Sequence, residues 1–235
     1  MVEEIALSGG RMTAGVVRIG DTVRRPIAGD RSEIQALLRH LENVGCTATP
    51  RFLGIDEAGR EILSYLPGDV PPDLGHYDEP ILRAAGALLR SFHDASRGFP
   101  AVGNAGAEVM CHNDWGPPNA VFSDGFPVGI IDFDTVRPGL RLWDLGYSAA
   151  SWIDLGDDAY SGADQISRLR AFAEGYDYPG CSVELIAVFC LARRAAVAAA
   201  GRAKGNLALA EWAEASLRWA TEHMTEQLLP TGMLP

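Results

Sequence analysis

The segment CHNDWGPPN, residues 111–119, and the segment GIIDFD, residues 129–134, decide most of what can be predicted about this chain. The first segment holds a carboxylate, Asp114, and a carboxamide five residues later, Asn119. The second is an apolar run that leads to another carboxylate, Asp132. Between the first two groups, Gly-Pro-Pro provides a rigid bend, so both side chains can face one cleft.

These three polar groups meet the needs of phosphoryl transfer from a nucleotide. A carboxylate must orient the acceptor hydroxyl and accept its proton, and oxygen ligands must hold Mg²⁺ against the phosphates. Taken in chain order, the groups predict Asp114 as the base, with Asn119 and Asp132 as the metal ligands. Each group alone is weakly informative, whereas the three together are specific.

Toward the N-terminus, short apolar runs alternate with turns. The patterns predict a hairpin over residues 15–25, a helix over 31–43 and a second hairpin over 52–66. Asp30, with Glu33 three residues later, predicts a capping box at the start of that helix.

Toward the C-terminus, the chain is mainly helical. A stretch rich in proline and glycine after Leu66 predicts a boundary between a β-rich lobe, residues 1–66, and a larger α-rich lobe, residues 67–235. The fold class is therefore predicted to be α+β, with two lobes. Helices are expected over residues 80–94, 163–176, 182–203 and 206–228, and a short hairpin over residues 120–132.

The motifs resemble those of the aminoglycoside phosphotransferase/choline-kinase-like family, HxDxxxxN followed by a downstream aspartate. The resemblance extends along most of the chain, because FHD at 92–94 resembles the end of the helix before the catalytic loop and LWDLG at 142–146 resembles the segment after the motifs. It implies the two-lobed protein-kinase-like fold, with Asp114 as the catalytic base and Asn119 and Asp132 as ligands of Mg²⁺. It also implies ATP or GTP as the phosphate donor and a small-molecule hydroxyl as the acceptor.

The resemblance implies supporting roles for three further residues. Asp144 is expected to be buried and to bond to the backbone of the catalytic loop. His112 is expected to be a structural support rather than a reactant. Asp134, which takes the place of the glycine in a DFG motif, is expected either to support the metal site or to end the strand.

The first lobe is expected to bind the nucleotide. Gly9 and Gly10 lie where the loop that covers the phosphates should be, and glycine lets backbone N–H groups approach a phosphate closely. By analogy with the family, the hinge that meets the base of the nucleotide is expected at three consecutive residues: Ser64, Tyr65 and Leu66.

The strand lysine with which the family grips the phosphates has no counterpart. Lys204, the single lysine of the chain, lies far along the second lobe. Arg24 is expected to replace the missing lysine, with Arg25 as the alternative, because arginine can bind phosphate bidentately. The glutamate that partners this lysine is also displaced, since the helix holds Ile34 at the matching position and Glu33 one residue early.

The segment after the motifs predicts the acceptor pocket. It combines an aromatic side chain with three carboxylates, which suits an amine or an amino sugar. The alternative interpretation is a solvated loop that leads into the next helix. The residues concerned are Trp152, Asp154, Asp157 and Asp158.

The formal net charge of −11 is concentrated after residue 66. Residues 1–66 contain 9 acidic and 8 basic residues, whereas residues 67–235 contain 22 and 12. This balance argues against nucleic acid or an anionic membrane as the partner and suits a cationic or neutral small molecule. The alternative is that the excess charge only keeps the protein in solution.

Localisation and redox state are predicted from what the sequence lacks. It has no run of about 20 apolar residues and no signal-peptide pattern, which predicts a cytoplasmic protein. It has no CxxC pair, so buried free thiols are expected for the four cysteines: Cys46, Cys111, Cys181 and Cys190.

Two other functions stay open. A kinase-like protein could bind a nucleotide or a metabolite without transferring phosphate, and the missing lysine motivates this alternative. A metal-dependent hydrolase that uses His112, Asp114 and Asp132 is less favoured. No second histidine lies close in sequence, and the β-rich lobe would have no explanation.

Overall fold

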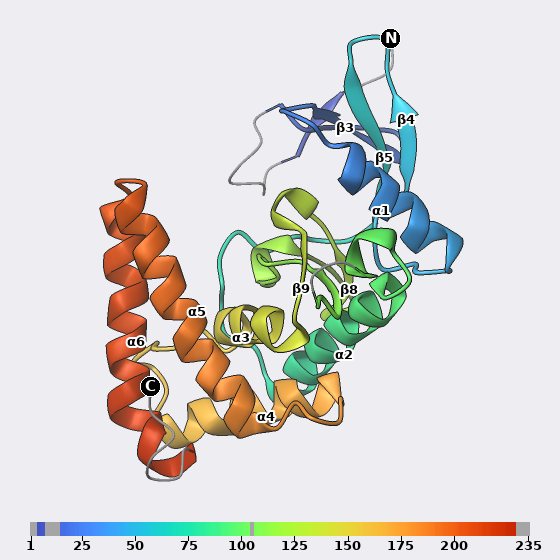
Figure 1. Ribbon diagram of the computed structural model, residues 1–235. Helices are drawn as coiled ribbons and strands as arrows, with labels where there is room; N and C mark the ends of the chain where they lie inside the picture. Colours follow the sequence, from blue (N-terminus) through green and yellow to red (C-terminus); the bar gives the residue numbers. More distant parts are fainter. Residues whose placement is uncertain (1–3, 8–14, 104–105, 229–235) are drawn as a thin grey trace.

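The computed structural model describes residues 4–7, 15–103 and 106–228, so Gly9 and Gly10 lie outside the described residues. The chain begins with a β-rich part and continues into a mainly helical part (Figure 1). The predicted α+β class is therefore confirmed. In the described part of the chain, no helix is both long enough and apolar enough to cross a membrane.

The first part is an antiparallel sheet of five strands with one helix beside it (Figure 1). The strand order is β1-β2-β3-β5-β4. Helix α1 (Ser32–Asn43) connects β3 to β4 and buries the apolar face that its sequence predicts. The strands are β1 (Ile5–Ala6), β2 (Val17–Ile19), β3 (Thr22–Pro26), β4 (Phe52–Ile55) and β5 (Arg60–Ser64).

The start of α1 differs from the prediction. The cap residue is Arg31, which makes no side-chain capping bond, and the carboxylate of Asp30 accepts a hydrogen bond from the backbone N–H of Ser32 at 2.9 Å. The capping box predicted from Asp30 and Glu33 is therefore wrong. The side chain of Arg31 instead forms ion pairs with Glu61, in the same part of the molecule, and with Asp134, in the second part.

The connection between the two parts, residues 65–78, lies against the second part. The backbones of Asp69 and Phe122 exchange two hydrogen bonds, at 2.9 and 2.8 Å. Gly68 has a φ of +143° there, and a Cβ atom at this position would overlap with the carbonyl oxygen of Phe122. We propose that the lobe boundary lies in this connection, after Leu66.

Among the described residues, the second part contains five helices and four short strands (Figure 1). Strand β6 pairs with β9, and β7 pairs with β8, both antiparallel. The helices are α2 (Glu79–Ser96), α3 (Arg141–Trp152), α4 (Gly162–Tyr176), α5 (Val183–Ala203) and α6 (Leu207–Leu228). The strands are β6 (Val109–Cys111), β7 (Ala120–Ser123), β8 (Phe126–Ile130) and β9 (Arg137–Gly139), with short 3₁₀ helices at η1 (Pro100–Gly103), η2 (Pro117–Asn119) and η3 (Phe133–Thr135).

Most predicted elements are confirmed to within a few residues, and α3 is the main omission. Nine of its twelve residues are buried. Leu145, Ala149 and Trp152 recur at the spacing of one helix face, and this signal was missed. The four cysteines are free, with Cys111 and Cys190 buried and Cys46 and Cys181 partly buried.

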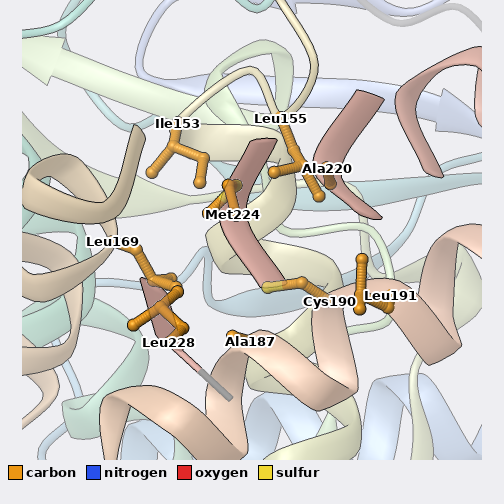
Figure 2. A pocket seen from close by; sticks show the side chains of 9 residues that line it. All are labelled: Ile153, Leu155, Leu169, Ala187, Cys190, Leu191, Ala220, Met224 and Leu228. Atoms are coloured by element: carbon orange, nitrogen blue, oxygen red, sulfur yellow. The ribbon is translucent and has the colours of Figure 1, made fainter. Parts of the chain in front are cut away.

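A small cavity of about 20 Å³ remains among the C-terminal helices (Figure 2). Its lining is apolar throughout, so it offers a water molecule or polar ligand no hydrogen-bond partner. We regard it as a packing gap. It is lined by Ile153, Leu155, Leu169, Ala187, Cys190, Leu191, Ala220, Met224 and Leu228.

Helices α2 and α4 cross closely at two glycines. A Cβ atom at Gly86 would overlap with the carbonyl of Phe172, and one at Gly175 with the carbonyl of Arg83. Gly86→Ala is therefore expected to lower the free energy of unfolding by about 1–3 kcal/mol, because the crowded helices must shift. Urea denaturation measures this change.

The matched control is Gly103→Ala, because nothing lies within 4 Å of the Cβ position there. This control is expected to change the free energy of unfolding by less than about 1 kcal/mol. Equal losses in the two variants would contradict the close helix crossing.

Candidate active site

Two cavities share Asp132 as a lining residue. One cavity, of about 400 Å³, is lined by residues of the β-rich part, such as Val23 and Leu63, and by residues of the second part, such as Ile131. The other, of about 540 Å³, is lined by residues of the second part, among them Asp114 and Asp132. Asp132 therefore stands where the contents of the two cavities can meet.

Asp114 is held by two side chains. The amide nitrogen of Asn119 donates to Oδ2 of Asp114 at 2.9 Å and to its backbone carbonyl at 2.7 Å. The hydroxyl of Tyr147 donates to Oδ1 of Asp114. The η2 turn, entered through Gly116, brings Asn119 back toward Asp114 across the bend that the two prolines impose.

The donor atoms that face the larger cavity suit Mg²⁺. Because the nitrogen of Asn119 is used on Asp114, its Oδ1 is the atom left for a cation. Asp132 lies two residues after the end of β8, has a left-handed backbone with a φ of +64°, and lines the same cavity. Carboxylate and carboxamide oxygens are the hard ligands that Mg²⁺ prefers. Burial and the charge of Asp134 raise the pKa of Asp132, and a nearby cation would favour its charged form.

The structure places Arg25, and not Arg24, beside these groups. Successive side chains of a strand point to opposite faces, so only one of the two can enter the cleft. Arg24 Nε lies 3.6 Å from Asp56 Oδ2, away from the site. Arg25 Nη2 lies 3.4 Å from Asp132 Oδ1, and Arg25 also pairs with Asp134. Arg25, the alternative to Arg24 as a replacement for the missing lysine, is therefore the arginine that reaches the site. The expectation for Arg24 is corrected, because its side chain points away.

A second arginine extends this group. Arg31 Nε donates to Glu61 Oε2 at 2.8 Å, and Arg31 also pairs with Asp134. Gln35 donates to the other oxygen of Glu61 at 2.8 Å. Although burial opposes it, the hydrogen bonds from the two arginines hold the pKa of Asp134 below its ordinary value. Asp134 thus bridges two arginines of the β-rich part.

Sequence reasoning missed Glu61 as the buried carboxylate of this group. Its exposed fraction is 1%, and it lies on β5, whereas the expected partner was sought on the helix. Ile34, at the helix position considered, is buried among apolar side chains. The available signal was a glutamate beside the apolar pair Ile62-Leu63 of a predicted strand, where a charge is rarely buried without a partner.

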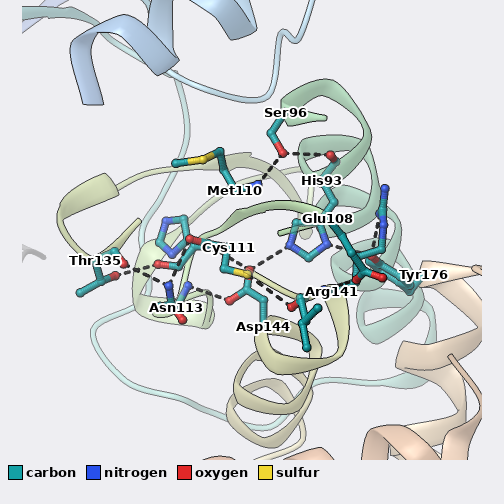
Figure 3. Close-up of polar contacts among 12 residues, drawn as sticks. His93, Ser96, Glu108, Met110, Cys111, Asn113, Thr135, Arg141, Asp144 and Tyr176 are labelled. Atoms are coloured by element: carbon teal, nitrogen blue, oxygen red, sulfur yellow. Dashed lines mark hydrogen bonds and ion pairs between the residues drawn. The ribbon is translucent and has the colours of Figure 1, made fainter. Parts of the chain in front are cut away.

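Asp144 anchors the loop that carries Asp114 (Figure 3). Its two oxygens accept hydrogen bonds from the backbone N–H groups of His112 and Asn113, each at 2.7 Å. Its side chain is fully buried. His112 in turn contacts the carbonyl of Ile131 through Nε2 at 3.1 Å, which ties the loop to the segment that carries Asp132.

A chain of buried side chains continues from Asp144 (Figure 3). His93 Nε2 lies 2.9 Å from Asp144 Oδ2, and His93 Nδ1 lies 2.8 Å from the hydroxyl of Tyr176. Arg141 donates to the same hydroxyl at 2.8 Å. Burial lowers the pKa of His93, so the ring is neutral, donates through Nε2 and accepts at Nδ1.

The predicted hinge residues Ser64, Tyr65 and Leu66 all line the 400 Å³ cavity. The backbone N–H of Ser64 donates to Arg51, and that of Tyr65 donates to Asp21, both at 2.9 Å. Within the described ranges, the backbone N–H of Leu66 makes no hydrogen bond. Of the three, Leu66 therefore has a backbone donor to offer a ligand.

The four residues predicted for the acceptor pocket are separated by the structure. Trp152 is fully buried against Trp115, with ring centroids 5.2 Å apart, so it cannot touch an acceptor. Asp158 is exposed to solvent. Asp157 Oδ2 bonds to His76 at 2.5 Å. Asp154 alone of the four lines the 540 Å³ cavity.

Asp154, Asp157 and His76 also form a possible ligand group, with one ligand atom of each within 4.8 Å of the others. Burial and the charge of Asp157 raise the pKa of Asp154. Because His76 and Asp157 already bond to each other, their proximity has an explanation without an ion.

Sequence reasoning also missed several residues of the larger cavity. They include Asp73 from the connection, Tyr147 and Ser151 from α3, and Trp212 from α6. A signal existed for Tyr147, which lies three residues after Asp144 and therefore on the same face of a helix. The helix itself was not predicted, so this signal could not be used.

Part of the chain matches a known protein family, and a longer part matches a known protein. The sequence profile of the phosphotransferase enzyme family matches residues 99–181, which include Asp114, Asn119, Asp132 and Asp144. Over 169 residues the chain is 36% identical to the trifolitoxin immunity protein of Rhizobium leguminosarum bv. trifolii. This match covers 66% of the chain and 63% of that relative's length.

Solved structures define the fold. A choline/ethanolamine kinase family protein from Mesorhizobium loti is similar, with a TM-score of 0.59 and 17% identity over 94% of this chain and 87% of that one. The GDP complex of aminoglycoside 2'-phosphotransferase-IIIa has a TM-score of 0.53 and 15% identity over 94% and 92%. The chain thus has the two-lobed protein-kinase-like fold. The predicted resemblance to aminoglycoside phosphotransferases and choline kinases is confirmed.

The buried chain predicts an acid-sensitive stability. Because the pKa of His93 lies below its ordinary value of 6.5, the unfolded state binds more protons than the folded state as the pH falls through this range. The free energy of unfolding is therefore expected to decrease as the pH is lowered from about 7 toward about 5. Urea denaturation at a series of pH values measures this dependence.

Two variants test the assignment to His93. His93→Gln is expected to lose about 1–3 kcal/mol at pH 7 and to show a weaker dependence on pH. His40→Gln, at a half-buried histidine whose Nε2 lies 3.1 Å from the backbone carbonyl of Ala95, is expected to retain the wild-type pH dependence. An unchanged pH dependence in the His93 variant would show that another group is responsible.

Proposed function

We propose that this protein is a nucleotide-dependent O-phosphotransferase, which transfers the γ-phosphate of ATP or GTP to a hydroxyl of a small molecule. The observation that carries the proposal is the position of Asp132, which lines two cavities and lies beside Asp114 and Asn119 in the larger one. A donor in the 400 Å³ cavity and an acceptor in the 540 Å³ cavity would meet there.

The chain's own residues divide the work. Asp114 accepts the proton of the acceptor hydroxyl while the oxygen bonds to phosphorus and the bond to the nucleoside diphosphate breaks. Asn119 and Asp132 would hold Mg²⁺, which when bound neutralises charge on the phosphates. Arg25 presents a guanidinium beside Asp132, where it can bind a phosphate oxygen once the nucleotide enters.

The nucleotide-binding contacts are part of the proposal. Leu66, with an uncommitted backbone N–H at the edge of the 400 Å³ cavity, is proposed to meet the base. The relative solved with GDP supports a purine nucleotide as the donor.

The lining of the larger cavity supports a cationic acceptor. It contains four aspartates, and none of the described side chains that line it is a lysine or an arginine. An aminoglycoside or another hydroxylated amine fits this charge. The apolar surfaces of Leu74, Leu209 and Trp212 line the same cavity and can contact a carbon framework.

A second candidate function is protection against a toxin. The 36% identity to the trifolitoxin immunity protein exceeds the 17% and 15% identity to the two solved structures. A toxin with a hydroxyl group would then be the acceptor, or would be bound without transfer. Expression of the chain in toxin-sensitive cells tests this function, and equal killing with and without the chain would exclude it.

Asp114→Asn is expected to lower phosphoryl transfer by about 10²- to 10⁴-fold, because the amide cannot accept the proton. Release of nucleoside diphosphate is measured with Mg²⁺, ATP or GTP, and a panel of hydroxylated amines, sugars and antibiotics. Asp158→Asn, at an exposed carboxylate, is the control and should keep full activity. Full activity in the Asp114 variant would overturn the mechanism.

Arg25→Gln is expected to raise the Kd of Mg²⁺-nucleotide by about 10- to 100-fold, equivalent to about 1.4–2.8 kcal/mol. The guanidinium that faces the cleft is lost, and the charges of Asp132 and Asp134 are left without it. Arg24→Gln is the matched control on the opposite face of the strand and should change the Kd by less than about threefold. Calorimetric titration measures both, and equal losses would contradict the assignment of Arg25.

A further inference from the structure

The hydroxyl of Tyr147 has no role in the steps above, although it contacts the proposed base. It donates a hydrogen bond to Oδ1 of Asp114 and lines the 540 Å³ cavity. Tyr147 lies on α3 three residues after Asp144, so both side chains project from one face of this helix toward the catalytic loop. Helix α3 therefore contacts the loop at two points. Asp144 bonds to the loop backbone, and Tyr147 bonds to the side chain of Asp114.

Asp114 is bonded on both of its oxygens by donors from different elements. Asn119, from η2, donates to Oδ2, and Tyr147, from α3, donates to Oδ1. A carboxylate bonded in this way cannot rotate about its Cβ–Cγ bond without losing both contacts. Each oxygen keeps a further lone pair, so an acceptor hydroxyl can still donate to it.

Tyr147 is a permanent donor in this position. Burial and the negative charge of Asp114 raise the pKa of Tyr147 above its ordinary value, so the phenol keeps its proton. A protonated phenol next to a carboxylate donates to it, and this bond holds one orientation of both groups.

Arg193, on α5, holds Tyr147 from behind. Its guanidinium centre lies 5.0 Å from the ring centroid of Tyr147 and 4.5 Å from that of Trp143. Its Nη2 donates to the backbone carbonyl of Asn113 at 3.3 Å. Among the described residues, no carboxylate oxygen lies within 4.0 Å of Arg193, so its contacts are to the aromatic rings and the catalytic loop.

We propose that Tyr147 is a positioning residue for phosphoryl transfer, which holds the carboxylate of Asp114 in the orientation that receives the proton of the acceptor hydroxyl. Arg193 supports it by holding both Tyr147 and the backbone at Asn113. The inference rests on the proposed function, in which Asp114 is the base. A misplaced catalytic group lowers the rate of the chemical step and leaves substrate binding unchanged.

The opposite role is also chemically possible and is separated by the test. The hydroxyl of Tyr147 could occupy the place of an acceptor hydroxyl and compete with it. Removal of the hydroxyl would then raise turnover, whereas loss of a positioning residue lowers it.

Tyr147→Phe removes the hydroxyl and keeps the ring against Arg193. Turnover is measured as phosphate release from Mg²⁺-ATP and Mg²⁺-GTP with water as the acceptor, together with the KM for the nucleotide. We expect kcat to fall about 10- to 100-fold with KM unchanged within about twofold. The midpoint of thermal unfolding is measured beside it to show that the variant is folded.

Tyr178→Phe is the matched control. The ring of Tyr178 also lies against an arginine, with the guanidinium carbon of Arg141 4.4 Å from the ring centroid, but its described ring contacts do not include Asp114. It should keep wild-type kcat. Arg193→Gln is the second variant and is expected to lower kcat by about 10-fold while retaining KM, which tests the same support if Tyr147→Phe fails to fold.

The outcomes are distinct. Wild-type turnover in both Tyr147→Phe and Arg193→Gln, or a raised kcat in Tyr147→Phe, would overturn this inference and leave the proposed function standing. A parallel rise in KM would assign Tyr147 to binding instead and would also overturn it. A wild-type protein that binds nucleotide but shows no turnover, either with water or with any acceptor of the panel, would overturn the proposed transferase activity, and the role of Tyr147 with it.

Discussion

The carboxylate of Asp144 is the constraint on which the geometry of the site depends. A charge in the interior is costly unless hydrogen bonds compensate it. Here the donors are His93 and the backbone N–H groups of His112 and Asn113, so part of the compensation comes from the loop that leads to Asp114. If the loop left this position, the buried carboxylate of Asp144 would lose two of its hydrogen bonds. The residue that follows, Asp114, is thereby placed at the cavity.

The two parts of the molecule are joined at the cleft by charge. Arg25 and Arg31, from the β-rich part, meet Asp132 and Asp134, from the second part, and Glu61 balances Arg31 on its own side. Two arginines and a strand glutamate thus occupy the region where the family uses a lysine and a helix glutamate. Guanidinium groups suit this task because each can bond to two carboxylates at once.

The candidate site could be predicted where its residues are close in sequence. Asp114 and Asn119 are separated by a bend that Gly-Pro-Pro enforces, and Asp132 follows an apolar strand, so their chemistry is visible along the chain. Tyr147 could not be predicted in the same way. It reaches Asp114 from α3, and the two residues are 33 positions apart in the chain. Trp152, chosen for its aromatic ring, lies on the buried face of the same helix.

The sequence by itself determined the fold class, the order of the elements and the three polar groups of the site, because periodicity, turns and motif spacing are local properties. Only the tertiary structure decided which of two adjacent arginines enters the cleft. Strand alternation sends Arg24 and Arg25 to opposite faces, but which face meets the second part depends on how the sheet packs. The pairing of Arg31 with Glu61, and of Tyr147 with Asp114, likewise joins residues about 30 positions apart, which no local pattern encodes.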